Sequence, residues 1–378
     1  MPPEVTAVEV TTFEPEFEDV GTFPNSHNVV YEPGSTGGWG TYGILQVHSD
    51  VGVTGEALFT GSMSPKDADY LLGRNPLERE AHWHATGRGE VPDLALWDLA
   101  GKYHDAPVYE LLGGRRQRLP AYASTSHGDE NGGLDSPEAY ADFAERCLEL
   151  GYPAFKIHGW PGGDEWRDVD REVETVHAVG DRVGDEMDLM LDPAGEYRTF
   201  GDALKVGQAC DEEGFFWYED PYFDGGHSLQ GNRRLREKLT TPVQVSGFLE
   251  TLEQRVDFVT EGATDSIRAG LEQGITGLMK VAGAAEGLGV DVELNGGGHA
   301  IRHCMASIRN THYYENGLFN PMWDHGCRPD EAYADGLRER LDAVDEDGTL
   351  PVPEGPGLGV EFDWSYVRDR QVDHRVYE

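Results

Sequence analysis

The chain has 378 residues, of which 38% are hydrophobic, and 30 Lys and Arg against 70 Asp and Glu give it a formal net charge of −40. This charge argues against binding to nucleic acid or to an anionic membrane surface, because both need a basic protein surface. The sequence also lacks the run of about 20 apolar residues that a membrane span requires.

The acidic residues are scattered along the chain rather than gathered in one tail. Such a surface is typical of adaptation to high salt, because the Debye length falls to about 3 Å in molar salt and like charges then repel weakly. The first residues lack the basic and apolar regions of a signal peptide. The 4 cysteines form no CxxC pair, which favours free thiols in a reducing compartment. We therefore expect the cytoplasmic protein of a halophile.

The first part of the chain mixes strands with helices. Strand patterns cover residues 8–13 and 41–48, and helical patterns cover residues 65–72 and 92–104. We expect an α+β domain over residues 1–117.

A glycine-rich aromatic loop lies between these two strands and contains His27, Tyr31 and Trp39. We expect these three side chains to contribute to substrate specificity. The alternative is a simple surface hairpin.

After this domain, strand and helix patterns alternate. The strand patterns lie near residues 119–124, 154–158, 188–192, 215–219, 242–246, 264–269 and 290–294. Repeated βα units predict a parallel sheet, and seven or eight of them over roughly 200 residues favour a closed barrel. The fold class is therefore α/β, with a TIM-like (β/α)7-8 barrel over residues 118–350. We expect residues 351–378 to pack back on the first domain.

Charged residues lie at the ends of three of these strands. Lys156 and His158 alternate with apolar residues, so they share one face of their strand. Asp192 and Glu219 end the next two strands. Because active sites of such barrels lie at the C-terminal ends of the strands, we expect these four side chains to meet in a site for metal-assisted proton chemistry.

As a set, these motifs resemble the enolase superfamily, and within its mandelate racemase/muconate lactonizing enzyme family the mandelate racemase branch. The likeness is to an acid-sugar dehydratase of a haloarchaeal type, and it covers nearly the whole chain, including the helical segment 95–114. It implies a Lys or His base and magnesium that stabilises an enediolate. It also implies a small carboxylate substrate and a homo-oligomer.

The resemblance assigns a role to each charged position. Lys156 would neutralise the substrate carboxylate or abstract a proton, and His158 would be the acid/base on the same face. Asp192 and Glu219 would be the first two ligands of one Mg²⁺ per subunit, since Mg²⁺ prefers carboxylate oxygens. Glu315 would help to hold the substrate carboxylate or the enolate.

Three positions depart from the pattern of the family. Gly247 stands where the third metal ligand is expected, and Glu250 is a candidate substitute or else a solvated glutamate at a helix start. Gly270 and Asn295 stand where an Asp–His dyad is expected on the opposite face, and we expect Asn295 to contact the substrate instead. His299 could act as an acid/base or merely begin the next helix.

These residues predict Mg²⁺-dependent removal of the proton α to a carboxylate. Dehydration of an acid sugar (an aldonate) is favoured, because elimination can use one face whereas racemisation needs an acid/base on both. Two alternatives stay open: a sugar-acid racemase or epimerase that uses His299, and a degenerate member that binds a metabolite without turnover.

Overall fold

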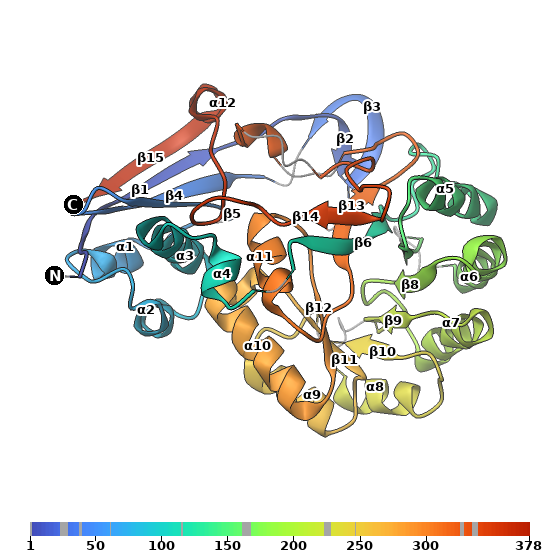
Figure 1. Cartoon of the computed structure of the whole chain (residues 1–378). Helices are drawn as coiled ribbons and strands as arrows, with labels where there is room; N and C mark the ends of the chain where they lie inside the picture. The colour runs from blue at the N-terminus through green and yellow to red at the C-terminus, as the bar shows by residue number, and fades with distance from the viewer. Residues whose placement is uncertain are drawn as a thin grey trace.

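The computed structural model describes residues 2–22, 29–37, 40–60, 62–114, 116–160, 168–222, 228–245, 247–325, 329–334 and 339–378. It has a mostly antiparallel first domain and a curved sheet of parallel strands surrounded by helices (Figure 1). This arrangement confirms the predicted α/β fold class. His27, Trp39 and Cys327 lie outside the described residues.

The first sheet joins the two ends of the chain. Its strands β1 (Val5–Phe13), β4 (Tyr42–Ser49), β5 (Thr54–Thr60) and β15 (Gln371–Tyr377) are antiparallel, in the order β15-β1-β4-β5. The chain end therefore completes the sheet that its beginning starts, as Figure 1 shows at the upper left. The domain boundaries at residues 117 and 350 stay a prediction.

Helices cover one side of this sheet. They are α1 (Pro65–Leu71), α2 (Arg79–Ala85), α3 (Glu90–His104) and α4 (Val108–Leu111). Gly55 of β5 lets α3 approach closely, because a Cβ at this position would clash with the carbonyl oxygen of Ala95. The side chain of Asp98 accepts the N–H of Glu56 at 2.7 Å and so ties α3 to β5.

The segment between β1 and β4 is a hairpin, where the sequence predicted a loop. Strands β2 (Phe17–Thr22) and β3 (Val29–Gly37) pair antiparallel. Phe17 and Val20 pack against Trp323, which follows the last barrel strand. The backbone N–H of Tyr31 donates to Asp129 Oδ2 at 2.6 Å, and Asp129 follows the first barrel strand. The hairpin therefore contacts the C-terminal ends of the barrel strands.

Eight parallel strands form the barrel sheet, in the order β12-β11-β10-β9-β8-β7-β6-β13. They are β6 (Arg118–Thr125), β7 (Ala154–His158), β8 (Asp188–Asp192), β9 (Trp217–Glu219), β10 (Val243–Val245), β11 (Ser266–Ala269), β12 (Asp291–Leu294) and β13 (Tyr314–Phe319). Strand β14 (Thr349–Pro351) pairs antiparallel with β6. Among the described residues no ladder joins β12 to β13, so the sheet curls but the predicted closed barrel is not completed by strand pairing. Glu293 Oε1 of β12 accepts the N–H of His312, which precedes β13, at 3.1 Å.

Helices alternate with these strands, as predicted. They are α5 (Pro137–Glu149), α6 (Val169–Val183), α7 (Phe200–Glu213), α8 (Leu229–Arg236), α9 (Leu252–Thr260), α10 (Gly274–Leu288) and α11 (His299–Ser307). Short elements complete the chain: two 3₁₀ turns (Leu271–Gln273 and Asp330–Ala332) and α12 (Trp364–Asp369). Side-chain caps set several helix starts, for example Ser136 at α5 and Thr199 at α7.

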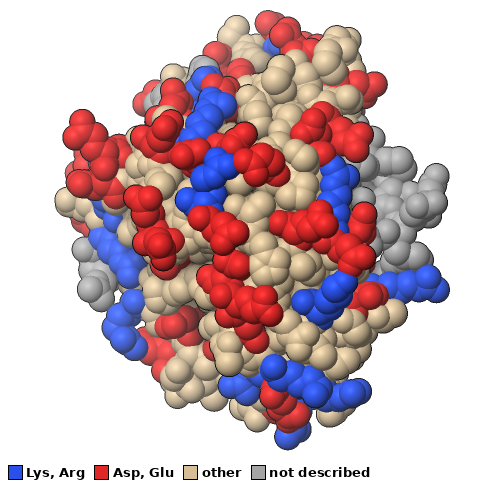
Figure 2. Space-filling model, turned by 90° about the vertical axis from the view of Figure 1, so that its right-hand side faces the viewer, with Lys and Arg blue, Asp and Glu red and all other residues tan. Residues whose placement is uncertain are grey.

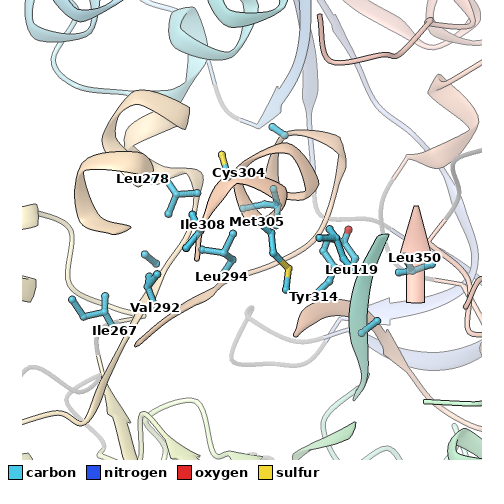
Figure 3. Packing of buried hydrophobic residues seen from close by; sticks show 14 of the residues in the cluster. Leu119, Ile267, Leu278, Val292, Leu294, Cys304, Met305, Ile308, Tyr314 and Leu350 are labelled. Carbon is cyan, nitrogen blue, oxygen red and sulfur yellow. The ribbon is translucent and has the colours of Figure 1, made fainter. Parts of the chain in front are cut away.

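The core lies between the strands and the helices around them. Figure 3 shows Ile267 of β11 and Val292 and Leu294 of β12 packing toward Leu278 of α10 and Ile308 after α11. Because side chains alternate along a strand, the next residues on these strands point to the inside of the barrel. On β11 this geometry places the side chain of Arg268, the residue after Ile267, in the interior.

The surface is rich in acidic residues. Figure 2 shows Asp and Glu side chains spread over one face, interrupted by Lys and Arg. None of the described helices is long and apolar enough to cross a membrane. Cys147, Cys210 and Cys304 are buried free thiols, as expected for the cysteines that the structure covers.

Candidate active site

Strand β7 carries the first two predicted site residues. All five of its residues are buried. Phe155 packs outward against Phe143 of α5, with ring centroids 6.1 Å apart. The alternation then turns Lys156 and His158 inward, as predicted.

Lys156 lies at the centre of a cluster of carboxylates. Its Nζ is 3.3 Å from Asp192 Oδ2, 3.3 Å from Glu219 Oε2 and 2.9 Å from Glu315 Oε1. These carboxylates come from the ends of β8 and β9 and from β13. The structure therefore brings together four of the predicted site residues from four strands.

A second cation, Arg268 of β11, completes this cluster and was missed in the sequence. Its Nε is 2.9 Å from Glu219 Oε1, and its Nη2 is 2.7 Å from Glu315 Oε2. Nη1 donates to the Leu294 carbonyl at 2.8 Å, and Nη2 donates to Tyr122 Oη at 3.0 Å. One guanidinium thus joins strands β6, β9, β11, β12 and β13.

The sequence does contain a pattern that points to Arg268. Alternation along Ser266–Ala269 places Arg268 on the opposite face from the apolar Ile267, which is the argument that identified Lys156. The resemblance points instead to the end of this strand at Gly270, where it implies an Asp.

Both cations keep their charge. Burial and Arg268 lower the pKa of Lys156, but Glu219 and Glu315 outweigh them and hold it well above its usual value. Burial also lowers the pKa of Arg268, and Glu219 again outweighs this effect, so the guanidinium stays protonated. Lys156 is therefore held as a cation in this cluster.

The carboxylates respond differently to burial. Burial raises the pKa of Asp192, but Lys156 and His158 lower it well below its usual value. Glu315 follows the same pattern, with Lys156 and Arg268 lowering its pKa against burial. For Glu219, burial outweighs Arg268 and its pKa is raised. Asp192 and Glu315 are thus held as anions.

His158 is held by both ring nitrogens. Nδ1 lies 2.9 Å from the carbonyl oxygen of Thr125, which can only accept, so Nδ1 carries a proton. Nε2 lies 3.0 Å from Asp192 Oδ2. A hydrogen bond to this carboxylate needs a proton on Nε2, so the pair can store one transferable proton.

His158 also lines a cavity of about 440 Å³ between the barrel and the first domain. The barrel contributes Asn295, Glu315 and His299, and the first domain contributes Phe59 and Glu90. Lys156 and Arg268, at 1% and 0% exposure, lie behind this wall. The described part of the chain thus forms a cavity bordered by two imidazoles, those of His158 and His299, with two buried cations behind its wall.

Asn295 and His299 lie in the same wall. Asn295 Oδ1 accepts from Arg268 Nη2 at 3.3 Å. His299 is the first residue of α11, and its ring centroid is 4.5 Å from that of Tyr333, another residue of the cavity wall. His299 therefore both begins the helix and borders the cavity.

Other predicted residues are not brought to this place. The Glu250 side chain is exposed just before α9, and its backbone N–H bonds to Gln254. Tyr31 is not among the described residues that line the cavity. His27 and Trp39 cannot be placed, since they fall outside the described ranges.

The barrel identifies the family of the chain. Residues 139–366 match the model of the enolase C-terminal domain-like family. The chain belongs to this family. The match confirms the predicted resemblance to the enolase superfamily.

Several relatives with similar sequences are named as dehydratases of sugar acids. A D-gluconate dehydratase of Thermoproteus tenax is 28% identical, over 88% of this chain and 70% of the relative. A D-xylonate dehydratase of Haloferax volcanii is 28% identical, over 87% of this chain and 85% of the relative. The structure of a D-glucarate dehydratase from Agrobacterium tumefaciens complexed with magnesium superposes with a TM-score of 0.84 and 28% identity, covering 98% of this chain and 99% of that one.

The oxygens of Asp192 and Glu219 already face other groups in this member of the family. Their partners are Ala194 N–H, Lys156, His158, Arg268 and Trp217 Nε1. Gly247 offers no side chain as a third ligand. Within the described ranges, no group of three or more His, Cys, Asp or Glu residues could hold a metal ion. The residues present therefore do not fit the predicted Mg²⁺ site on Asp192, Glu219 and Glu250.

Proposed function

We propose that this protein dehydrates an acid sugar, with His158 removing the proton α to the carboxylate. The observation that carries the proposal is the position of His158, which borders the cavity while its Nε2 contacts Asp192 at 3.0 Å. The dehydratase activity of the relatives at 28% identity supports the same reaction.

The substrate of such a reaction is a carboxylate with hydroxyl groups on C2 and C3. The imidazole of His158, once its Nε2 has lost its proton, takes the proton from C2 and leaves the electron pair in an enediolate. This electron pair then forms the C2–C3 double bond as the C3–O bond breaks. The leaving hydroxide takes the proton from His158 Nε2 and departs as water. The resulting enol becomes a 2-keto-3-deoxy acid when C3 accepts a proton and the enol hydroxyl releases one.

Lys156 acts in this proposal as a fixed charge. It shares the oxygen Oδ2 of Asp192 with His158, so its ammonium group lies close to the site where negative charge develops. In a buried site such a preoriented charge stabilises an anion more strongly than water does. No step of the proposal uses a metal.

The polar wall of the cavity orients the substrate. Asn295 and Glu315 border the cavity beside His158, and Arg268 contacts both. Asn295 would donate to a substrate oxygen through its amide, and Glu315 would accept from a hydroxyl. His299 would contact the substrate from the start of α11. A cytoplasmic location and a homo-oligomeric state belong to this proposal as predictions.

The test is turnover of a panel of aldonates by the purified protein in molar KCl, with detection of 2-keto-3-deoxy acids. We expect at least one aldonate to lose water, and H158Q to lack this activity. A panel that returns only epimerised acids would favour the racemase alternative. A protein that binds an acid without converting it would favour the degenerate alternative.

A further inference from the structure

We propose that the guanidinium of Arg268 takes the place of a divalent cation, so that the charge cluster of this protein is complete without metal. This inference deepens the proposed function and rests on it only where activity is the readout. It concerns Arg268 as a positioning residue, because Arg268 lies behind the cavity wall rather than in it.

Arg268 contacts Glu219, one of the two carboxylates expected to bind the metal, and also contacts Glu315. Its side chain has 0% exposure and contacts Glu219 Oε1 at 2.9 Å and Glu315 Oε2 at 2.7 Å. The bonds to the Leu294 carbonyl and to Tyr122 Oη fix the plane of the guanidinium. A bulky and permanently charged group therefore fills the interior between β9, β11 and β13.

The position that lacks a ligand lies beside this arginine. A Cβ built on Gly247 would be 3.8 Å from Arg268 Cγ and 2.5 Å from Asp220 Oδ2. A carboxylate at position 247 would therefore extend from a point next to the arginine stem. Relative to the pattern of the family, this chain therefore lacks a negative charge at position 247 and has a positive charge, that of Arg268, beside this position.

The charges of the buried cluster balance without a divalent cation. Asp192, Glu219 and Glu315 face Lys156 and Arg268, and His158 supplies the remaining positive charge when it is protonated. A divalent cation added to this set would leave an uncompensated positive charge in a buried place, which is costly. A site with Glu at position 247 and no arginine would instead have a large negative excess that a divalent cation satisfies.

The test is Mn²⁺ binding in molar KCl, followed by electron paramagnetic resonance, with and without an aldonate. We expect no stoichiometric binding by the wild-type protein and no change in its Tm with millimolar Mg²⁺. We expect R268Q/G247E to gain one Mn²⁺ site. Because Gly247 has an ordinary backbone conformation and only the end of the Asp220 side chain obstructs it, the glutamate can be accommodated.

R255Q is the control, because Arg255 is also buried, at 1% exposure, but pairs with Glu272, which is not one of the carboxylates that contact Lys156. It should gain no Mn²⁺ site. Stoichiometric Mn²⁺ binding by the wild type that D192N abolishes would overturn the inference, whether or not R268Q/G247E folds. Such a result would leave the proposed dehydration intact. Dehydration that survives exhaustive treatment with a chelator would support both proposals. If the protein neither turns over an aldonate nor binds Mn²⁺, only the proposed function would be contradicted.

Discussion

His158 Nε2 lies 3.0 Å from Asp192 Oδ2, the oxygen that Lys156 Nζ approaches at 3.3 Å. The transferable proton of this protein is therefore placed beside a fixed positive charge.

Removing the charge of Lys156 should destabilise the fold. In K156M, three buried carboxylates lose a shared partner, and breaking a buried ion pair from one side costs roughly 3 to 5 kcal/mol. Urea unfolding would measure this loss. Lys205 pairs with Asp170 on the surface, so K205M should change stability little. A K156M protein as stable as the wild type would contradict the cluster described above.

The cavity should favour aldonates over aldarates, the corresponding diacids. Glu90, Asp330 and Glu339 line it in addition to Glu315. Hydroxyl groups of an aldonate can donate to these carboxylates, whereas the second carboxylate of an aldarate would be repelled. We expect a higher kcat/KM for each aldonate than for its matching aldarate, and a smaller difference in E90Q. Preference for the diacids would contradict this account of the wall.

His303 should make stability depend on pH. Its Nδ1 accepts the N–H of Tyr109 at 3.1 Å and its Nε2 donates to the Leu358 carbonyl at 3.1 Å, so the buried ring is neutral. Burial lowers its pKa from 6.5 to about 4. Between these values the unfolded chain binds a proton that the folded protein does not. The contribution of neutral His303 to the free energy of unfolding is thus fully present above pH 6.5 and is lost as the pH falls toward 4.

The slope of this loss is about 1.4 kcal/mol per pH unit. Glutamine can both accept from Tyr109 and donate to Leu358, so H303Q should lose less stability than the wild type over this range. Urea unfolding above the upper pKa and at a pH between the two would measure the difference. Identical pH profiles for both proteins would argue against a neutral His303.

The acidic surface should make the protein more stable in concentrated salt. A net charge of −40 repels itself, and screening shortens the Debye length from about 10 Å at 0.1 M to about 3 Å at 1 M. We therefore expect Tm to rise with KCl over this range. An unchanged or falling Tm would mean that the scattered charges of Figure 2 contribute little repulsion.

Much of the architecture could be predicted because it depends on local periodicity. Strand and helix alternation after Arg118 predicted the parallel sheet, and period-two alternation turned Lys156 and His158 inward. Strand β13, which carries Glu315, was not among the predicted strand patterns. Its Asn316-Gly317 pair is typical of a turn, and the register of β13 shifts there, between Gly317 and Phe319.

The identity of the partners could not be predicted in the same way. Arg268 meets Glu219 and Glu315 only because the curvature of the barrel brings β9, β11 and β13 together. The spacing of these residues along the chain does not reveal these contacts. Spacing along the chain also suggested Glu250 as a substitute metal ligand. A residue three positions from Gly247 lies close to it in sequence, but the turn before α9 exposes its side chain.

The most direct test of the central claim is NMR of an aldonate substrate in D₂O with wild-type protein and H158Q. We expect the wild type to remove the C2 proton and release the keto acid with deuterium at C3. We expect H158Q to slow both processes by about 10²- to 10⁴-fold, while H84Q, a surface histidine variant, behaves as the wild type. Loss of the C2 proton at the wild-type rate in H158Q would show that another residue is the base and would contradict the account.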